Sequence, residues 1–166
     1  MTSGIQVRDY TPTDLKQVEE IILTAENFGR DFLDHERRVV RFHHEFPDSG
    51  RILVASEKAT AEIVGYAAIR YGWRALIIES IITEHNHLRL GIGRLMMDHI
   101  KQIGEDHPDM EIIRVDTGDF MDYAQAFYLA CGFQISGFAS HYLSWHNNQV
   151  IFVYRLKQAH SINEGG

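Results

Sequence analysis

One acidic residue interrupts an apolar stretch near the middle of the chain. Glu79 lies within the run Leu76–Ile82, whose β-branched residues predict a strand buried on both faces. Burial disfavours the charged form of a carboxyl group, which would raise the pKa of Glu79 toward the range useful for a general base. The alternative is a carboxylate that forms an ion pair, for example with an arginine. We therefore treat Glu79 as a candidate base, acting directly or through water.

A glycine-rich turn follows this predicted strand. Gly91-Ile92-Gly93 opens a segment whose apolar residues recur at helical spacing. A helix start offers unpaired N–H groups and the positive end of the helix dipole, and glycines let an anion approach the backbone. Arg89 and Arg94 flank the glycines, and no acidic residue lies between Glu84 and Arg94. The turn therefore predicts a phosphate site, although an ordinary strand-to-helix turn is the alternative reading.

A tyrosine lies in a second predicted helix, Met121–Cys131. Its apolar residues follow i, i+3, i+4, i+7 spacing, and the helix should end at Gly132. This spacing alone makes Tyr128 a core aromatic residue.

These segments resemble the signatures of the GNAT superfamily of N-acetyltransferases. The family's acetyl-CoA motif, Gln/Arg-x-x-Gly-x-Gly/Ala, corresponds to residues 88–93, with Leu88 in place of Gln or Arg. The family's second signature, Asn-x-x-Ala-x-x-x-Tyr-x-x-x-Gly-Phe, matches residues 121–133 at four of five fixed positions, with Met121 in place of the asparagine. The order of predicted elements, β, α, α, β, β, β, α, β, α, β, β, is also that of the family.

The resemblance implies transfer of the acetyl group of acetyl-CoA, the cosubstrate, to a primary amine of a small molecule or peptide. Tyr128 corresponds to the tyrosine that protonates or hydrogen-bonds the leaving thiolate, opposite Glu79 as base. Backbone groups of the strand end would pair with the pantetheine arm, and amides of the turn would hold the pyrophosphate. The implied cofactor contacts are Ile81, Ile82, Thr83, Arg89, Leu90, Gly91, Ile92, Gly93 and Arg94.

The acceptor cleft of the family is built by its first two helices and last strands. Here these are Asn27–Phe46 and His141–Trp145. The aromatic and imidazole side chains that could line such a cleft are Phe28, Phe32, His35, Tyr142 and Trp145. Periodicity predicts a helix over Asp31–Phe46, with a face formed by Phe32, Val39, Phe42, His43 and Phe46.

A different class of function stays open, a non-catalytic acyl-CoA-binding sensor or interaction domain of the same fold. The departures at Leu88 and Met121 are compatible with it. The presence of both Glu79 and Tyr128 favours the enzyme.

Bulk properties agree with one α/β domain over residues 1–160, followed by a flexible tail, Ser161–Gly166. We expect a single-domain, GNAT-like fold with a central mixed, mostly antiparallel sheet of about seven strands and about four helices. The net charge of −7 argues against nucleic acid as a partner and favours a cationic one. One cysteine, no signal peptide and no membrane-length apolar run predict a cytoplasmic protein without membrane contact. We expect a monomer or homodimer, although the sequence carries no signal for the oligomeric state. Three histidines between residues 35 and 44 lack a ligand cluster beside them, so no metal is expected.

Overall fold

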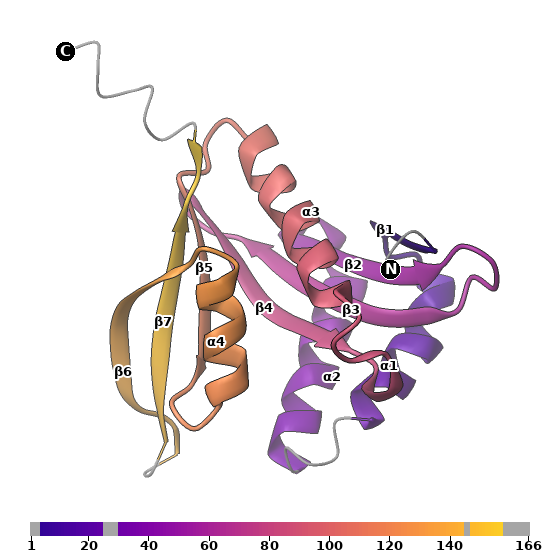
Figure 1. Ribbon diagram of the computed structural model, residues 1–166, viewed down its shortest axis with the longest axis horizontal. Helices are drawn as coiled ribbons and strands as arrows, with labels where there is room; N and C mark the ends of the chain where they lie inside the picture. Colours follow the sequence, from indigo (N-terminus) through magenta and orange to yellow (C-terminus); the bar gives the residue numbers. More distant parts are fainter. Residues whose placement is uncertain (1–3, 25–29, 145–146, 158–166) are drawn as a thin grey trace. The chain divides into compact units, whose positions relative to one another are not determined.

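The computed structural model describes residues 4–24, 30–144 and 147–157. The strands are β1 (Ile5–Asp9), β2 (Gly50–Glu57), β3 (Ile63–Tyr71), β4 (Ala75–Thr83), β5 (Ile112–Gly118), β6 (Gln134–Ser144) and β7 (Asn147–Arg155). The α-helices are α1 (Leu15–Leu23), α2 (Arg30–Glu45), α3 (Ile92–Asp106) and α4 (Asp122–Ala130). Strand order is β1-β2-β3-β4-β5-β7-β6 (Figure 1).

The sheet is mixed, as predicted. β4 pairs with β5 in parallel, whereas β1 with β2, β2 with β3, β5 with β7 and β6 with β7 are antiparallel. Seven strands and four α-helices in the described part of the chain confirm the expected α/β class. No helix among these residues is long and apolar enough to cross a membrane.

The chain divides into two compact units. The first comprises Met1–Arg70 and Glu79–Ile100, and the second comprises Tyr71–Ile78 and Lys101–Gly166. β4 therefore contributes its first four residues to the second unit and the rest, from Glu79, to the first. The predicted tail, Ser161–Gly166, lies outside the described residues.

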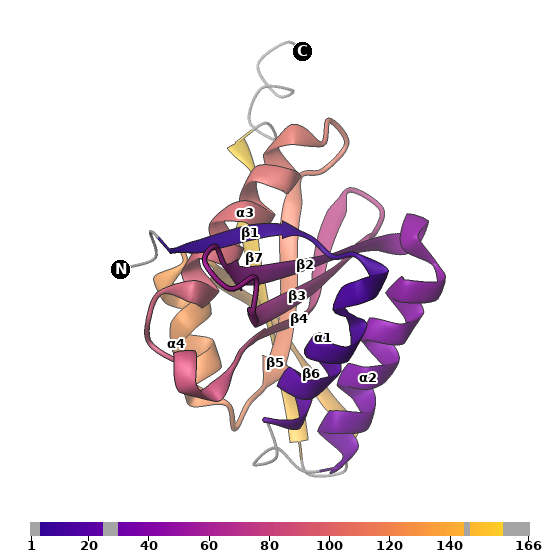
Figure 2. The same ribbon diagram turned by 90° about the vertical axis from the view of Figure 1, so that its right-hand side faces the viewer.

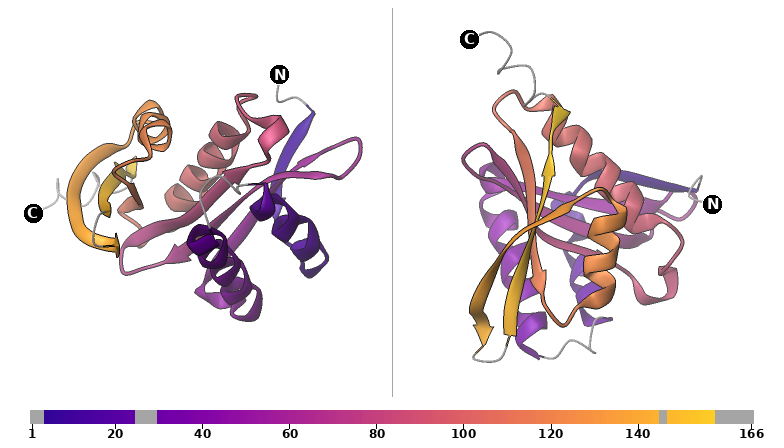
Figure 3. Two further views of the ribbon diagram at one scale, coloured as in Figure 1. Left: turned by 90° about the horizontal axis from the view of Figure 1, so that it is seen from below. Right: turned by 60° about the vertical axis from the view of Figure 1, so that its left-hand side comes forward.

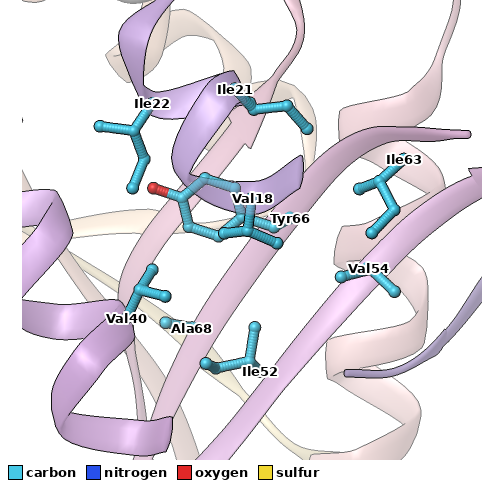
Figure 4. Packing of buried hydrophobic residues seen from close by; sticks show 9 residues of the cluster. All are labelled: Val18, Ile21, Ile22, Val40, Ile52, Val54, Ile63, Tyr66 and Ala68. Carbon is cyan, nitrogen blue, oxygen red and sulfur yellow. The ribbon is translucent and has the colours of Figure 1, made fainter. Parts of the chain in front are cut away.

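In the first unit, helices cover both faces of the strands. α1 and α2 lie side by side against one face, and α3 lies against the other (Figures 2 and 3). Side chains alternate between these faces along β3. Tyr66 and Ala68 are fully buried beneath α1 and α2, whereas a Cβ added at Gly65 would lie 3.1 Å from Met96 of α3. The hydrophobic cluster between these two helices and the strands is formed by Val18, Ile21, Ile22, Val40, Ile52, Val54, Ile63, Tyr66 and Ala68 (Figure 4).

Helix α2 buries only part of the predicted face. The buried side chains are Glu36, Val40 and His43, at i, i+4 and i+7, and Val39 packs against the core cluster. His43 and Val39 of the predicted face therefore point inward, whereas Phe42 and Phe46 are 44% and 55% exposed and contact each other, with ring centroids 5.2 Å apart. The prediction is wrong for these two phenylalanines, because buried Glu36 finds polar partners on the strands, which the periodicity of apolar residues cannot reveal.

The second unit contains α4 and the strands β5, β7 and β6. α4 ends before Gly132, which has a φ of +86° and so suits glycine, as predicted. β7 begins at Asn147 and pairs with β6 in antiparallel register.

Candidate active site

Glu79 has a hydrogen-bond partner on each carboxylate oxygen. Arg70 of β3 donates from Nε to Oε1 at 2.9 Å, and His43 Nε2 of α2 lies 2.7 Å from Oε2. Burial alone would raise the pKa of the Glu79 carboxyl, but the hydrogen bonds and charges of His43 and Arg70 outweigh it and hold the pKa below its ordinary value. Glu79 thus forms the ion pair with an arginine, the expected upward shift of its pKa is wrong, and its role as a base stays a prediction.

The sequence reasoning missed His43 as a partner of Glu79. Its side chain is 1% exposed, compared with 23% for Glu79. Nδ1 of His43 lies 3.1 Å from Ser49 Oγ, and Ser49 Oγ lies 2.7 Å from the carbonyl oxygen of Phe46. The available signal was a histidine in the middle of a predicted buried face, because a buried polar side chain requires a partner.

A second buried acid, Glu36, lies two helical turns before His43 on α2. Tyr66 donates its hydroxyl to Glu36 Oε2 at 2.7 Å, and the Ser80 hydroxyl donates to the same oxygen. Burial raises the pKa of the Glu36 carboxyl, the two hydroxyl donors oppose this shift, and the negative charge of Glu79 adds to it. The sequence reasoning did not single out Glu36. Glu79 belongs to β4, and Glu36 accepts a hydrogen bond from Ser80 of the same strand. The pKa values of these two carboxyl groups are shifted in opposite directions.

The turn from β4 to α3 has the backbone features expected of a phosphate site. Arg89 and Gly91 have φ values of +62° and +84°, in the left-handed region. The first backbone bond of α3 runs from Leu95 N to Gly91 O at 3.0 Å, so the amides of residues 92–94 precede it at the positive end of the helix. Gly91 is exposed and has no side chain to obstruct an anion. These residues fit a pyrophosphate.

The strand end before this turn, Ile81–Thr83, is half-buried. A Cβ added at Gly65 of β3 would lie 3.0 Å from the carbonyl oxygen of Ile82, so the glycine permits a close approach of the two backbones. Glu84 N then donates to Val64 O at 2.9 Å. Pairing of Ile81–Thr83 with a pantetheine arm stays a prediction.

Tyr128 belongs to the second unit, where its ring is 6% exposed. Ring centroids of Phe127, Phe133 and Phe152 lie 5.5, 5.9 and 5.6 Å from that of Tyr128. The expected contribution of Tyr128 to the core is therefore confirmed, and its role toward the thiolate stays a prediction. Met121, at the asparagine position of the signature, accepts from Thr117 Oγ1 at 3.5 Å through its sulfur.

The predicted acceptor cleft is described only in part. Phe32 is half-buried and His35 is exposed. Phe28, Trp145 and the side chain of Tyr142 lie outside the described residues. Among the side chains that are described, no three of His, Cys, Asp or Glu gather so that they could hold a metal ion.

Comparison with known families decides the relationship that these features suggest. Residues 15–133 match the sequence model of the acetyltransferase (GNAT) family. The chain belongs to the GNAT acetyltransferase family. This match contains α2, Glu79, the glycine turn and Tyr128. No curated protein matches the GNAT chain significantly.

Solved structures share the GNAT fold at low sequence identity. Ard1 from Thermoplasma volcanium has a TM-score of 0.76 at 21% identity, covering 92% of this chain and 98% of its own. The ribosomal-protein-S18-alanine N-acetyltransferase from Escherichia coli has a TM-score of 0.75 at 14% identity, covering 92% and 94%. A Bacillus anthracis protein assigned as a streptothricin acetyltransferase, in complex with acetyl coenzyme A, has a TM-score of 0.59 at 23% identity, covering 64% and 62%.

Proposed function

We propose that this protein is an N-acetyltransferase that moves the acetyl group of acetyl-CoA directly onto a primary amine of a small molecule or peptide. The match to the GNAT family over residues 15–133 carries the proposal. The left-handed Gly91 at the start of α3 supports the cosubstrate, because it leaves helix amides open to a pyrophosphate. A solved structure of the same fold holds acetyl coenzyme A.

In this reaction the thioester is already reactive, so the protein must orient the amine, remove its proton and stabilise the thiolate. Glu79 serves as the base, directly or through water. With its pKa held low, Glu79 is ionised at neutral pH and is a weak base toward a free ammonium ion. The amine nitrogen becomes more acidic as it bonds to the thioester carbonyl, and at that stage an ionised carboxylate can take its proton.

Tyr128 serves as the acid toward the leaving thiolate. The supporting observation is its position in the Ala-x-x-x-Tyr-x-x-x-Gly-Phe signature, Ala124–Phe133. Its ring is held by aromatic neighbours, which restricts the directions that the hydroxyl can take. An aromatic core position and a catalytic hydroxyl are compatible, because the two parts of the side chain have different tasks.

An amine acceptor fits the charge of the molecule. The net charge of −7 and the ionised Glu79 attract a cation. The Escherichia coli structural neighbour is named as an N-acetyltransferase for an alanine of ribosomal protein S18, which is a peptide amine. Small-molecule and peptide amines therefore both belong in the test.

The test is release of free thiol from acetyl-CoA in the presence of polyamines, aminoglycosides, amino acids or peptides with free N-termini. Thiol release that requires one of these amines, together with an acetylated product of the expected mass, supports the proposal. Acylation of an alcohol or nucleic acid while every amine fails would contradict it. Tight acetyl-CoA binding without turnover on any acceptor would favour the alternative, a sensor or interaction domain.

A further inference from the structure

His43 is enclosed by its own helix, by the turn after it and by β2. Gly50, the first residue of β2, leaves room for the imidazole, because a Cβ there would lie 2.7 Å from His43 Cε1 and 2.0 Å from Ile69 O. The Phe42 ring contacts the imidazole edge-on, at a centroid distance of 5.4 Å. The imidazole is therefore packed closely between Gly50 and Phe42.

The hydrogen bonds around His43 hold the ring between Glu79 and Ser49. Nε2 lies 2.7 Å from Glu79 Oε2 and donates to it, because an ionised carboxylate can only accept. Nδ1 lies 3.1 Å from Ser49 Oγ, and the Ser49 hydroxyl donates to Phe46 O at 2.7 Å. Both ring nitrogens therefore have polar partners, which fixes the plane of the imidazole.

Ser49, His43 and Glu79 form a chain in the order of a nucleophile, a base and an acid. A nucleophilic serine must give its proton to the histidine, whereas the Ser49 hydroxyl donates to the carbonyl oxygen of Phe46. Ser49 therefore serves as an anchor for the imidazole.

Glu79 is consequently held from two sides. His43 occupies one direction of Oε2 and Arg70 occupies one direction of Oε1. An ionised carboxylate can accept about four hydrogen bonds, so each oxygen keeps one further direction for an amine or a water molecule. These two donors, of which His43 is buried, thus determine where the remaining lone pairs point.

We propose that His43 is a positioning residue of the transfer reaction, which orients the Glu79 carboxylate toward the acceptor amine through a buried imidazole–carboxylate hydrogen bond anchored by Ser49. The inference rests on the proposed function for its kinetic evidence. Misplacement of a reacting group by about 1 Å can cost on the order of 10²-fold in rate. We expect a loss of this size when His43 no longer holds the Glu79 carboxylate in its orientation.

Titratable groups on α2 and β3 interact with Glu79. His43 of α2 and Arg70 of β3 contact it and favour its ionised form. Glu36 of α2 interacts with it unfavourably, as like charges do. Ser80, next in the strand, donates to Glu36 and thereby holds that second acid. Loss of the His43 charge therefore raises the pKa of Glu79, and the acidic limb of the pH–rate curve moves to higher pH.

The test compares His43→Gln, which keeps an uncharged N–H donor, with His43→Leu, which removes donor and charge. His44→Gln is the matched control, because His44 is the next residue of α2 and bonds Tyr10 through Nδ1 at 2.8 Å, not Glu79. We expect His43→Leu to lower kcat by about 10²-fold with acetyl-CoA affinity unchanged. His43→Gln should lower kcat by a smaller factor and move the acidic limb of the pH–rate curve to higher pH. His44→Gln should change neither quantity.

A second measurement, which needs no activity, is the ¹³C NMR titration of the Glu79 carboxyl carbon. The midpoint of this titration should move to higher pH in His43→Gln and stay unchanged in His44→Gln. If the Glu79 titration and the acidic limb are both unmoved in a folded His43→Gln protein, His43 does not act through Glu79 and the inference is overturned. If no amine is acetylated while the Glu79 titration moves as expected, the proposed function fails and the His43–Glu79 pair stands.

Discussion

At the scale of single residues, Glu79 and Tyr128 differ in their surroundings. Glu79 is a carboxylate whose pKa is lowered by Arg70 and His43 despite burial. Tyr128 is a core aromatic residue, and the role proposed for it as an acid requires only its hydroxyl. A substitution that removes one of these contributions without the other can therefore separate packing from catalysis.

Tyr128→Phe makes this separation, because it keeps the ring among Phe127, Phe133 and Phe152 and deletes only the hydroxyl. A general acid typically contributes on the order of 10²–10⁴ in rate, so kcat should fall within that span. Acetyl-CoA affinity and the melting temperature should stay near their parent values. Steady-state kinetics and calorimetry measure the three quantities.

Tyr128→Ala is the companion variant, since loss of the whole ring should cost about 3–5 kcal/mol in the free energy of unfolding. Parent-like turnover by Tyr128→Phe, with chemistry shown to be rate-limiting, would mean that Tyr128 is only a core residue.

At the scale of elements, α2 carries two buried polar groups on one face, Glu36 and His43. Glu36 is surrounded by Tyr66, Ser80 and apolar side chains, and burial raises its pKa. Such a group stabilises the fold fully at pH values below the ordinary pKa of an unfolded glutamate, about 4.3. This contribution is lost as the pH rises through the raised pKa of the folded state.

Glu36→Gln should remove that loss, because an amide oxygen still accepts from Tyr66 and Ser80 but does not ionise. The free energy of unfolding should then fall less than the parent value as the pH rises above about 4. Urea unfolding at a series of pH values gives the comparison. Glu45→Gln, at an exposed position of the same helix, is the matched control and should leave the parent slope unchanged.

A pH dependence of Glu36→Gln identical to that of the parent would show that Glu36 titrates normally. The contribution of Glu79 to the free energy of unfolding should depend on pH in the opposite direction. Its pKa is lowered, so its contribution is present above the ordinary pKa of glutamate and is lost as the pH falls through the lowered value.

At the scale of the whole molecule, acetyl-CoA binding should be visible as stabilisation of the folded chain. A ligand present at a hundredfold excess over its Kd stabilises the native state by about 2.7 kcal/mol, which raises Tm. Scanning calorimetry with and without acetyl-CoA measures the rise. Acetyl-pantetheine, which lacks the pyrophosphate, should give a smaller rise at the same concentration.

Gly91→Val should abolish the rise in Tm, because a β-branched side chain at a φ of +84° is strained and blocks the turn. Arg89→Gly is the companion variant, since glycine accepts the φ of +62° at that position and keeps the backbone amide while it removes the guanidinium. It should lower the rise in Tm without abolishing it. A folded Gly91→Val protein that binds acetyl-CoA as tightly as the parent would place the phosphate site elsewhere.

The sequence alone determined the α/β class, the order of the elements and the family. Buried strands, helix spacing and the glycines at positions 91 and 132 are local properties, and local patterns express them directly. The candidate base, the phosphate turn and the tyrosine were found in the same way, because each belongs to a contiguous motif.

Only the tertiary structure decided the partners of Glu79 and the buried face of α2. His43 is 36 residues from Glu79, and Glu36 is 44 residues from Ser80. A hydrogen bond between side chains so distant in sequence leaves no periodic pattern. The direction of a pKa shift depends on such contacts, since burial and paired charges oppose each other at Glu79 and only the folded arrangement determines which is larger.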